Sequence, residues 1–212
     1  MWTIHSLFQK IAYILFPKAC YNCRKEGFSL CASCLVSCRQ TIDTPYIYIT
    51  SVYSFKDPLI KRVIHAIKYY HRKDLVEPLA EGIAQTIKKD SGYDLTKDQW
   101  ILVPVPMPQF RKYMRGYNQA ELIAQELARK LSLPLRKDLI VRVHAPKRQA
   151  TMKSRSERLK NQHASFKVTG DVDGLRILLV DDVTTTGATL HEQRIILLKA
   201  GARSVRAVTI AH

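Results

Sequence analysis

Two adjacent carboxylates and a hydroxyl-rich turn lie together in the segment from Ile177 to Leu190, ILLVDDVTTTGATL. Free backbone N–H groups at a helix start, the positive end of the helix dipole and Thr hydroxyls can together hold a phosphate. A glycine lets that phosphate approach the backbone closely, and each hydroxyl of a ribose diol can donate a hydrogen bond to a carboxylate. The segment therefore predicts a ribose 5-phosphate site, with the candidate residues Asp181, Asp182, Thr184, Thr185, Thr186, Gly187, Ala188 and Thr189.

The residues on either side of this segment predict how it is positioned. Ile177 to Val180 is a continuous apolar run, typical of a strand that is buried on both faces of a parallel sheet. A helical pattern follows and ends near Gly201, which suits the position just after a helix. We therefore expect the site at the carboxyl end of the strand, where parallel α/β folds bind ligands. The alternative is an ordinary strand and turn in which the two Asp side chains only cap the helix.

All five cysteines lie near the start of the chain, and four of them form two Cys-x2-Cys pairs, Cys20 with Cys23 and Cys31 with Cys34. Two such pairs can converge on one tetrahedral Zn²⁺ ion, and a segment too short for its own core needs such a constraint. We expect this zinc to be structural, because four thiolates leave no open position for a substrate. A pair of disulfides is the alternative. Cys38 could replace Cys34 as a ligand or be a free thiol.

The charge of the chain points to an anionic partner. Its 212 residues include 34 Lys and Arg against 18 Asp and Glu, a formal net charge of +16, which favours nucleic acid, an anionic membrane surface or a diphosphate substrate. The sequence shows neither a signal peptide nor the roughly 20 apolar residues of a membrane span, so we expect a cytoplasmic protein. An amphipathic pattern from Trp2 to Phe16 predicts a helix that packs on the cysteine segment, or docks on a partner or on the inner face of the membrane.

Apolar patterns along the rest of the chain alternate between strand and helix. We expect strands at 46–55, 101–105, 139–143, 177–180 and 205–210, and helices at 59–67, 75–87 and 119–131, the last capped by Asn118. This alternation predicts an α/β fold with a mostly parallel sheet flanked by helices, in which all four later strands take part. Between the first two helices, residues 69–73 (YYHRK) form an aromatic and basic cluster. It could stack on a nucleotide or a single strand, or be a solvated helix end.

Several motifs together resemble one known family. VDDVTTTGAT at 180–189 resembles the phosphoribosyl diphosphate (PRPP) motif of type I phosphoribosyltransferases. This motif, the four cysteines near the start of the chain and several further motifs together resemble the ComF family of phosphoribosyltransferase-like proteins. The resemblance covers nearly the whole chain. The further motifs are VPVPM at 103–107, RGYNQA at 115–120, and the residues Gln149, Arg158, Asn161 and Phe166.

The resemblance implies a domain organisation and a set of ligands. Residues 46–212 would form a type I phosphoribosyltransferase-like domain, and residues 1–45 a small N-terminal module that combines the amphipathic helix with the zinc finger. The resemblance also implies PRPP as ligand, bound together with Mg²⁺. ComF family members are associated with the uptake of transforming DNA, so single-stranded DNA and a DNA-uptake helicase are candidate partners.

A second resemblance concerns the diphosphate. Residues 104–120 are similar to the part of amidophosphoribosyltransferases near the diphosphate, and residues 144–160 stand where those enzymes have a mobile loop. If PRPP reacts, diphosphate leaves C1 through an oxocarbenium-like state, so the site needs cations and closure against water. Lys153, Arg155 and Arg158 are the candidates for that role, although each could instead contact nucleic-acid phosphates. The sequence identifies no general base.

Three functions are compatible with these residues. The first is a phosphoribosyltransferase that acts on PRPP, with an acceptor that the sequence does not reveal. The second is a PRPP-sensing accessory protein of the competence machinery without turnover. The third is a DNA-uptake factor that binds single-stranded DNA through basic and aromatic residues. We expect a PRPP site in a protein linked to natural transformation.

Overall fold

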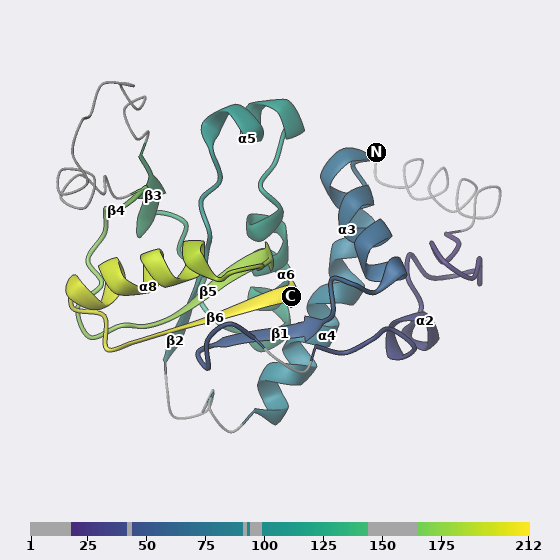
Figure 1. Ribbon diagram of the computed structural model, residues 1–212, viewed down its shortest axis with the longest axis horizontal. Helices are drawn as coiled ribbons and strands as arrows, with labels where there is room; N and C mark the ends of the chain where they lie inside the picture. The colour runs from purple at the N-terminus through teal and green to yellow at the C-terminus, as the bar shows by residue number, and fades with distance from the viewer. Residues whose placement is uncertain (1–17, 42–43, 91–92, 94–98, 144–164) are drawn as a thin grey trace, which may run out of the picture.

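A four-stranded parallel sheet forms the centre of the fold (Figure 1). This computed structural model describes residues 18–41, 44–90, 93, 99–143 and 165–212. The strand order is β1-β6-β5-β2, and every neighbouring pair is parallel. The strands are β1 (Ile49–Tyr53), β2 (Trp100–Pro104), β5 (Arg176–Val183) and β6 (Ser204–Ala211). The predicted α/β class with a mostly parallel sheet is confirmed.

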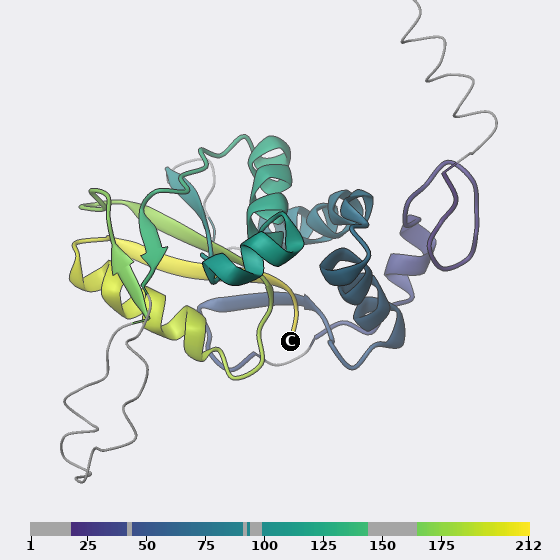
Figure 2. The same ribbon diagram turned by 90° about the horizontal axis from the view of Figure 1, so that it is seen from above.

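Helices cover both faces of this sheet (Figure 2). The helices α4 (Val76–Lys89) and α6 (Gln119–Leu131) pack together on one face, and α8 (Ala188–Lys199) lies on the other. Successive side chains of β5 point to opposite faces, so Leu178 belongs to the core below α4 and α6, while Leu179 belongs to the core below α8. Because both faces of β5 are buried, its sequence is continuously apolar.

Local signals in the sequence account for where the helices begin. Asp57 accepts hydrogen bonds from the first backbone N–H groups of α3 (Pro58–Tyr69), and Asn118 accepts one from Ala120 at the start of α6. The helices predicted at 59–67, 75–87 and 119–131 are therefore confirmed within a few residues. The remaining helical elements are short: α2 (Ala32–Val36), the 3₁₀ turn η1 (Lys73–Leu75) and α5 (Gln109–Arg115).

The strand predicted at 139–143 exists, but its placement in the parallel sheet is wrong. It forms β3 (Ile140–Arg142), which pairs antiparallel with β4 (Phe166–Val168) in a separate two-stranded ribbon beside α8. The reason is burial: Ile140 is buried but Val141 and Arg142 are exposed, so this strand lacks the two apolar faces that a central parallel strand needs. The strand predicted at 46–55 is also shorter than expected, because β1 covers only Ile49–Tyr53; it pairs in parallel with β6 at one edge of the sheet.

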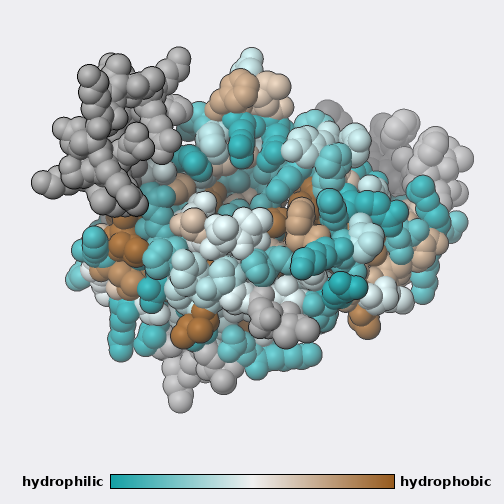
Figure 3. Space-filling view, viewed as in Figure 1, coloured by the Kyte–Doolittle hydropathy of each residue, from teal (hydrophilic) through white to brown (hydrophobic). Residues whose placement is uncertain are grey.

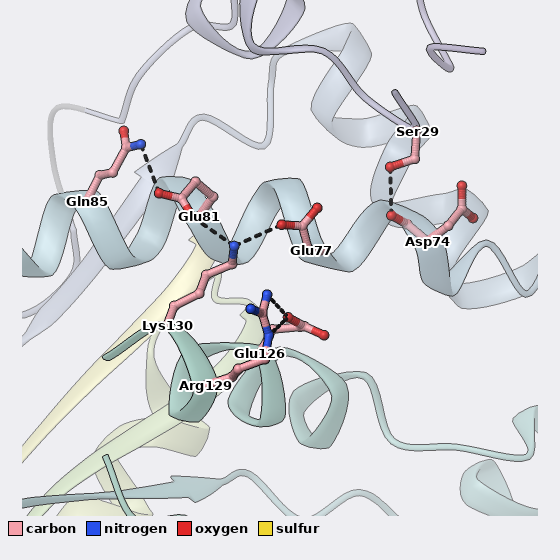
Figure 4. Close-up of polar contacts among 8 residues, drawn as sticks. All are labelled: Ser29, Asp74, Glu77, Glu81, Gln85, Glu126, Arg129 and Lys130. Carbon is pink, nitrogen blue, oxygen red and sulfur yellow. Dashed lines mark hydrogen bonds and ion pairs between the residues drawn. The ribbon is translucent and has the colours of Figure 1, made fainter. Parts of the chain in front are cut away.

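Polar contacts fasten α6 and the cysteine segment to the helices α4 and η1 (Figure 4). The Lys130 ammonium lies 2.9 Å from a Glu77 carboxylate oxygen and 2.8 Å from one of Glu81, and its side chain is only 10% exposed. The Ser29 hydroxyl donates a 2.8 Å hydrogen bond to the backbone carbonyl of Asp74. Because the carboxylates of these ion pairs are exposed, the pairs add only modestly to stability.

The front of the chain is described only from residue 18. The helix predicted from Trp2 to Phe16 therefore lies outside the described residues, and the domain boundary between residues 45 and 46 stays a prediction. Within the described ranges, no helix is long and apolar enough to cross a membrane.

Candidate functional site

The two carboxylates of the predicted site lie within the last residues of β5 rather than after it. Asp181 pairs in register with Thr209 of β6, which is fully buried, whereas Asp181 and Asp182 are partly buried. An Asp181 carboxylate oxygen accepts the backbone N–H of Asp182 at 2.8 Å, and Asp182 accepts that of Val183 at 2.7 Å. Neither carboxylate caps α8. Its N-cap residue is Gly187, and no side chain accepts a capping hydrogen bond there. The alternative in which the Asp pair only caps the helix is wrong.

The hydroxyl-rich loop leads directly into the start of α8, as the sequence predicts. Gly187 has φ +71°, and a Cβ atom there would come within 2.9 Å of Pro45 and Tyr46, so glycine is required for both conformation and space. The first backbone N–H groups of α8 have no partner within the helix, and Thr185, Thr186 and Thr189 are exposed beside them. Thr184 differs from the other hydroxyls, because it is buried and its N–H bonds to the Ala211 carbonyl. The loop therefore offers hydroxyls and N–H groups to an anion at a helix N-terminus.

A lysine that the sequence analysis did not single out lies against the carboxylates. Lys68, in the last turn of α3, places its ammonium 2.7 Å from Asp182, and the two side chains are 23% and 14% exposed. Periodicity places Lys68 off the apolar face of α3, but nothing in the sequence says which acid it meets. The carboxylate pair is thus partly neutralised from a second element.

Even so, the carboxylates are held in an unfavourable electrostatic setting. Burial, followed by the adjacent negative charge of Asp182, raises the pKa of Asp181 to about 8. The backbone N–H of Asp182 and the positive charges of Lys68 and Arg142 act in the opposite direction but do not outweigh these two effects. A perturbed carboxyl of this kind, at the carboxyl end of a parallel strand, is typical of a ligand site.

Basic residues lie on the β2 side of the carboxylates. Arg115, at the end of α5, stacks its guanidinium over the Tyr69 ring at 5.2 Å and donates a 3.0 Å hydrogen bond to Gln119. The Asn118 amide donates to the Val105 carbonyl at 2.9 Å, which ties the start of α6 to the end of β2. The predicted diphosphate residues Lys153, Arg155 and Arg158 lie outside the described residues.

An aromatic stack beside the loop is a further feature that the sequence analysis missed. Tyr46 stacks on His191 of α8 with ring centroids 4.7 Å apart, and the Tyr48 hydroxyl lies 2.6 Å from His191 Nδ1. Since Tyr46 also packs over Gly187, this stack holds the first turn of α8 against the segment that leads into β1.

The four predicted metal ligands come together in the structure. The sulfur atoms of Cys20, Cys23, Cys31 and Cys34 all lie within 4.8 Å of one another. None of the five cysteines forms a disulfide, so the disulfide alternative is wrong. The Cys38 thiol instead donates to the Cys34 carbonyl, and burial, followed by the nearby Asp57 carboxylate, raises the pKa of Cys38 to about 11. Four cysteine sulfurs in this arrangement could bind a zinc ion.

A short contact path joins the cysteine cluster to the carboxylates. The Asn22 amide donates to Cys34 Sγ at 3.4 Å, and Arg62 of α3 donates to the Asn22 side-chain oxygen at 2.9 Å. Because α3 also carries Lys68, one helix contacts both the cysteine segment and the Asp pair.

Comparison with known proteins identifies a matching domain family and several related proteins. Residues 118–212 match the family model described as phosphoribosyl transferase domain. The DNA utilization protein YhgH of Salmonella typhimurium is 29% identical over 88% of this chain and 86% of its own length. The competence protein ComFC of Bacillus subtilis is 30% identical over 76% of this chain and 62% of its own, and the competence protein F of Haemophilus influenzae is 37% identical over 52% and 49%.

Solved structures show weaker similarity. An allosteric regulatory enzyme of purine biosynthesis aligns with 63% of this chain at a TM-score of 0.42 and 17% identity, and the match spans only 25% of that longer chain. A hypoxanthine phosphoribosyltransferase from Staphylococcus aureus aligns at 0.38 and 12%.

Because the pKa of Asp181 is raised, replacing this residue with a neutral one should stabilise the folded protein at high pH. A carboxyl whose pKa is higher in the folded than in the unfolded chain favours folding at low pH, and this contribution is lost as pH rises from 3.8 through about 8. Asp181→Asn resembles the neutral form, so it should raise the thermal unfolding temperature at about pH 9 and change it little below about pH 4. Asp171→Asn, at an exposed turn, is the control and should show no such rise. Equal stability of Asp181→Asn and wild type at high pH would contradict the electrostatic account.

Proposed function

Because this chain belongs to the ComF family of phosphoribosyltransferase-like proteins, we propose that it binds PRPP with Mg²⁺ at the carboxyl end of β5. The observation that carries this proposal is the pair Asp181 and Asp182, set directly before the exposed hydroxyls at the start of α8. The carboxylates would accept hydrogen bonds from the two ribose hydroxyls. The α8 N-terminus with Thr185, Thr186 and Thr189 would hold the 5-phosphate.

The donor set also fits Mg²⁺ bound with the substrate. Mg²⁺ binds through one or two carboxylates and substrate phosphates, and retains several waters. The Asp pair would supply the carboxylates, and the metal would neutralise charge on the diphosphate. Lys68 compensates the negative charge of Asp182 in the ligand-free protein. A bound cation would take over part of this compensation.

We propose further that the PRPP is used for phosphoribosyl transfer. Lys153, Arg155 and Arg158 are proposed to contact the departing diphosphate. PRPP sensing without turnover is the alternative, and a diphosphate-release assay separates the two. The names of the relatives associate them with competence and DNA utilisation, so we place the activity in DNA uptake, with a DNA-uptake helicase and the inner membrane face as proposed contacts.

Calorimetric titration tests the PRPP site directly. Mg²⁺-PRPP should bind the wild-type protein, and the double variant Asp181→Asn, Asp182→Asn should bind at least about tenfold more weakly, because the charge-assisted hydrogen bonds are lost. The matched control is Asp171→Asn, Asp173→Asn, which removes two negative charges from an exposed turn and should leave the affinity unchanged. Equal affinity in the two double variants, or no binding by wild type, would reject the proposed site.

We also propose that Cys20, Cys23, Cys31 and Cys34 bind one structural zinc ion. The four sulfurs are close enough to share a tetrahedral ion, and Cys20 additionally accepts the Cys31 backbone N–H at 3.3 Å, a contact typical of a thiolate ligand. The segment around them is too short to bury a core of its own. The ion would therefore stabilise the conformation of the cysteine segment. The contacts of Asn22 with Cys34 and Arg62 would hold that segment against α3.

Metal analysis of two single variants tests this site. Cys34→Ser should lose zinc and unfold at a lower temperature than wild type, because a ligand is removed and metal binding is coupled to folding. Cys38→Ser should keep one equivalent of zinc, since Cys38 lies outside the cluster and a serine hydroxyl can still donate to the Cys34 carbonyl. Zinc loss in Cys38→Ser with retention in Cys34→Ser would reverse the ligand assignment.

A second candidate function, binding of single-stranded DNA, is favoured by one surface. The aromatic-basic surface consists of α5 and the end of α3, where Phe110, Tyr113, Met114, Tyr69 and Tyr70 are exposed beside Arg111, Lys112 and Arg115. Figure 3 shows apolar side chains gathered over α5 at the top of the molecule. Exposed rings interleaved with cations suit stacked bases and their phosphates.

Fluorescence anisotropy with a labelled oligothymidylate tests this surface. Tyr69→Ala, Tyr113→Ala should weaken binding by about tenfold or more, because stacking contributes about 1–3 kcal/mol per base. The slope of log affinity against log salt should stay unchanged in that variant and become shallower in Arg111→Ala, Lys112→Ala. Phe28→Ala, an exposed ring on the front module, is the control. Binding that is independent of salt would rule out this interface.

A further inference from the structure

A pocket of about 490 Å³ adjoins the proposed PRPP site. It lies where the carboxyl ends of β1 and β6 meet the segment after the cysteines. The described residues that line it are Arg39, Gln40, Thr41, Ser54, Phe55, Lys56, Thr184, Thr185 and His212. Since Thr184 and Thr185 begin the loop that leads into α8, the pocket and the proposed sugar-phosphate site share a wall.

The sheet order places this pocket on one side of the two carboxylates and residues 104–120, the segment that resembles a diphosphate site, on the other. β5, which carries the two carboxylates, lies between β6 and β2. The pocket is at the end of β6, whereas the segment that resembles a diphosphate site follows β2. With the ribose on the carboxylates and the diphosphate beside the segment after β2, as proposed, a group bound in the pocket would approach the sugar from the side opposite to the diphosphate, which is the approach that a displacement at C1 requires.

The charge of the lining favours an anionic ligand. Arg39 and Lys56 contribute two cations and no Asp or Glu lines the pocket; within the described part of the chain, neither cation forms a side-chain ion pair. Asp57, the nearest acid in sequence, is engaged elsewhere, since it accepts the backbone N–H groups of Arg39, Leu59 and Ile60. Phe55 supplies a half-buried ring beside these cations, a surface suited to a planar molecule.

The geometry of His212 provides a proton acceptor at the pocket wall. Its Nδ1 lies 3.2 Å from the Thr184 carbonyl oxygen. Because a carbonyl can only accept, this contact requires the proton on Nδ1, and a neutral imidazole then carries its lone pair on Nε2. The His212 backbone is also fixed, since its N–H donates to Tyr53 and its carbonyl accepts from Phe55.

We propose that this pocket is the acceptor site for phosphoribosyl transfer and that it binds a planar nitrogen nucleophile bearing a carboxylate. The inference rests on the proposed function and gives it a substrate class. The acceptor nitrogen forms a bond to C1 of PRPP, and the bond from C1 to the diphosphate oxygen breaks with its electron pair going to diphosphate. The proton of the acceptor nitrogen goes to His212 Nε2. Arg39 and Lys56 bind the carboxylate, and Phe55 packs against the ring.

Matched pairs of probes test the ligand class. Orotate and uracil differ only in a carboxylate, as do anthranilate and aniline, and each is titrated into wild-type protein saturated with ribose 5-phosphate. We expect at least one carboxylate to bind about tenfold or more tightly than its neutral partner, because its charge-assisted hydrogen bonds have no equivalent there. Arg39→Ala, Lys56→Ala should abolish this difference. Lys61→Ala, Lys199→Ala, which removes two exposed cations away from the pocket, should retain it.

The outcomes separate this inference from the proposed function. If Mg²⁺-PRPP binds but neither carboxylate does, or if the carboxylates bind as well to Arg39→Ala, Lys56→Ala as to wild type, the acceptor pocket is rejected and the PRPP site stands. If Mg²⁺-PRPP does not bind, the proposed function fails, whereas the carboxylate titrations still decide whether the pocket selects planar anions.

Diphosphate release with the bound carboxylate tests the role of His212. His212→Gln removes the proton acceptor, so release should slow by about a hundredfold or more while affinity for the carboxylate stays within about twofold. Unchanged release in His212→Gln would overturn the role of His212 and leave the pocket in place. Absence of release from wild type with every bound carboxylate would overturn the acceptor assignment.

Discussion

The proximity of two carboxylates at the end of a buried strand is the interaction on which the rest of the site depends. Asp181 and Asp182 are adjacent in β5 and are partly removed from water. Each carboxylate accepts one backbone N–H, and Lys68 forms an ion pair with Asp182, so the two negative charges are only partly compensated. Burial and mutual repulsion make this arrangement costly, as the raised pKa of Asp181 shows. A perturbed acid at the carboxyl end of a parallel strand is typical of a ligand site, so this arrangement supports the proposed binding role.

The parts that the sequence could predict are those with local causes. β5 is recognisable because its residues are apolar on both faces, the start of α8 because a hydroxyl-rich turn precedes it, and the cysteine cluster because ligand spacing is a local property. Lys68 and the pocket could not be predicted, because they depend on which segments the tertiary fold brings together. The misplacement of β3 has the same origin: its length and composition suit a strand, but its partner is set by the exposure of Val141 and Arg142.

The cysteine segment is connected to the candidate site by side-chain contacts and not only by the chain that joins them. Arg62 and Lys68 lie on the same helix, α3, and the first contacts Asn22 beside the cysteine cluster while the second contacts Asp182. The buried face of α3, including Ile60, Val63 and Ile64, fixes that helix on the core. One helix that is fixed on the core therefore contacts both the cysteine segment and the carboxylate pair.

The two halves of the chain carry different parts of the proposed site. The match to the phosphoribosyl transferase domain covers residues 118–212, which include the carboxylates, the hydroxyl-rich loop and His212. Lys68 and the cationic wall of the pocket, Arg39 and Lys56, lie before that range. The domain match thus covers the residues proposed for the sugar-phosphate end of the site. The residues proposed to select the acceptor come from the segment that follows the cysteines, so under this proposal specificity would depend on a part of the chain outside the range of that match.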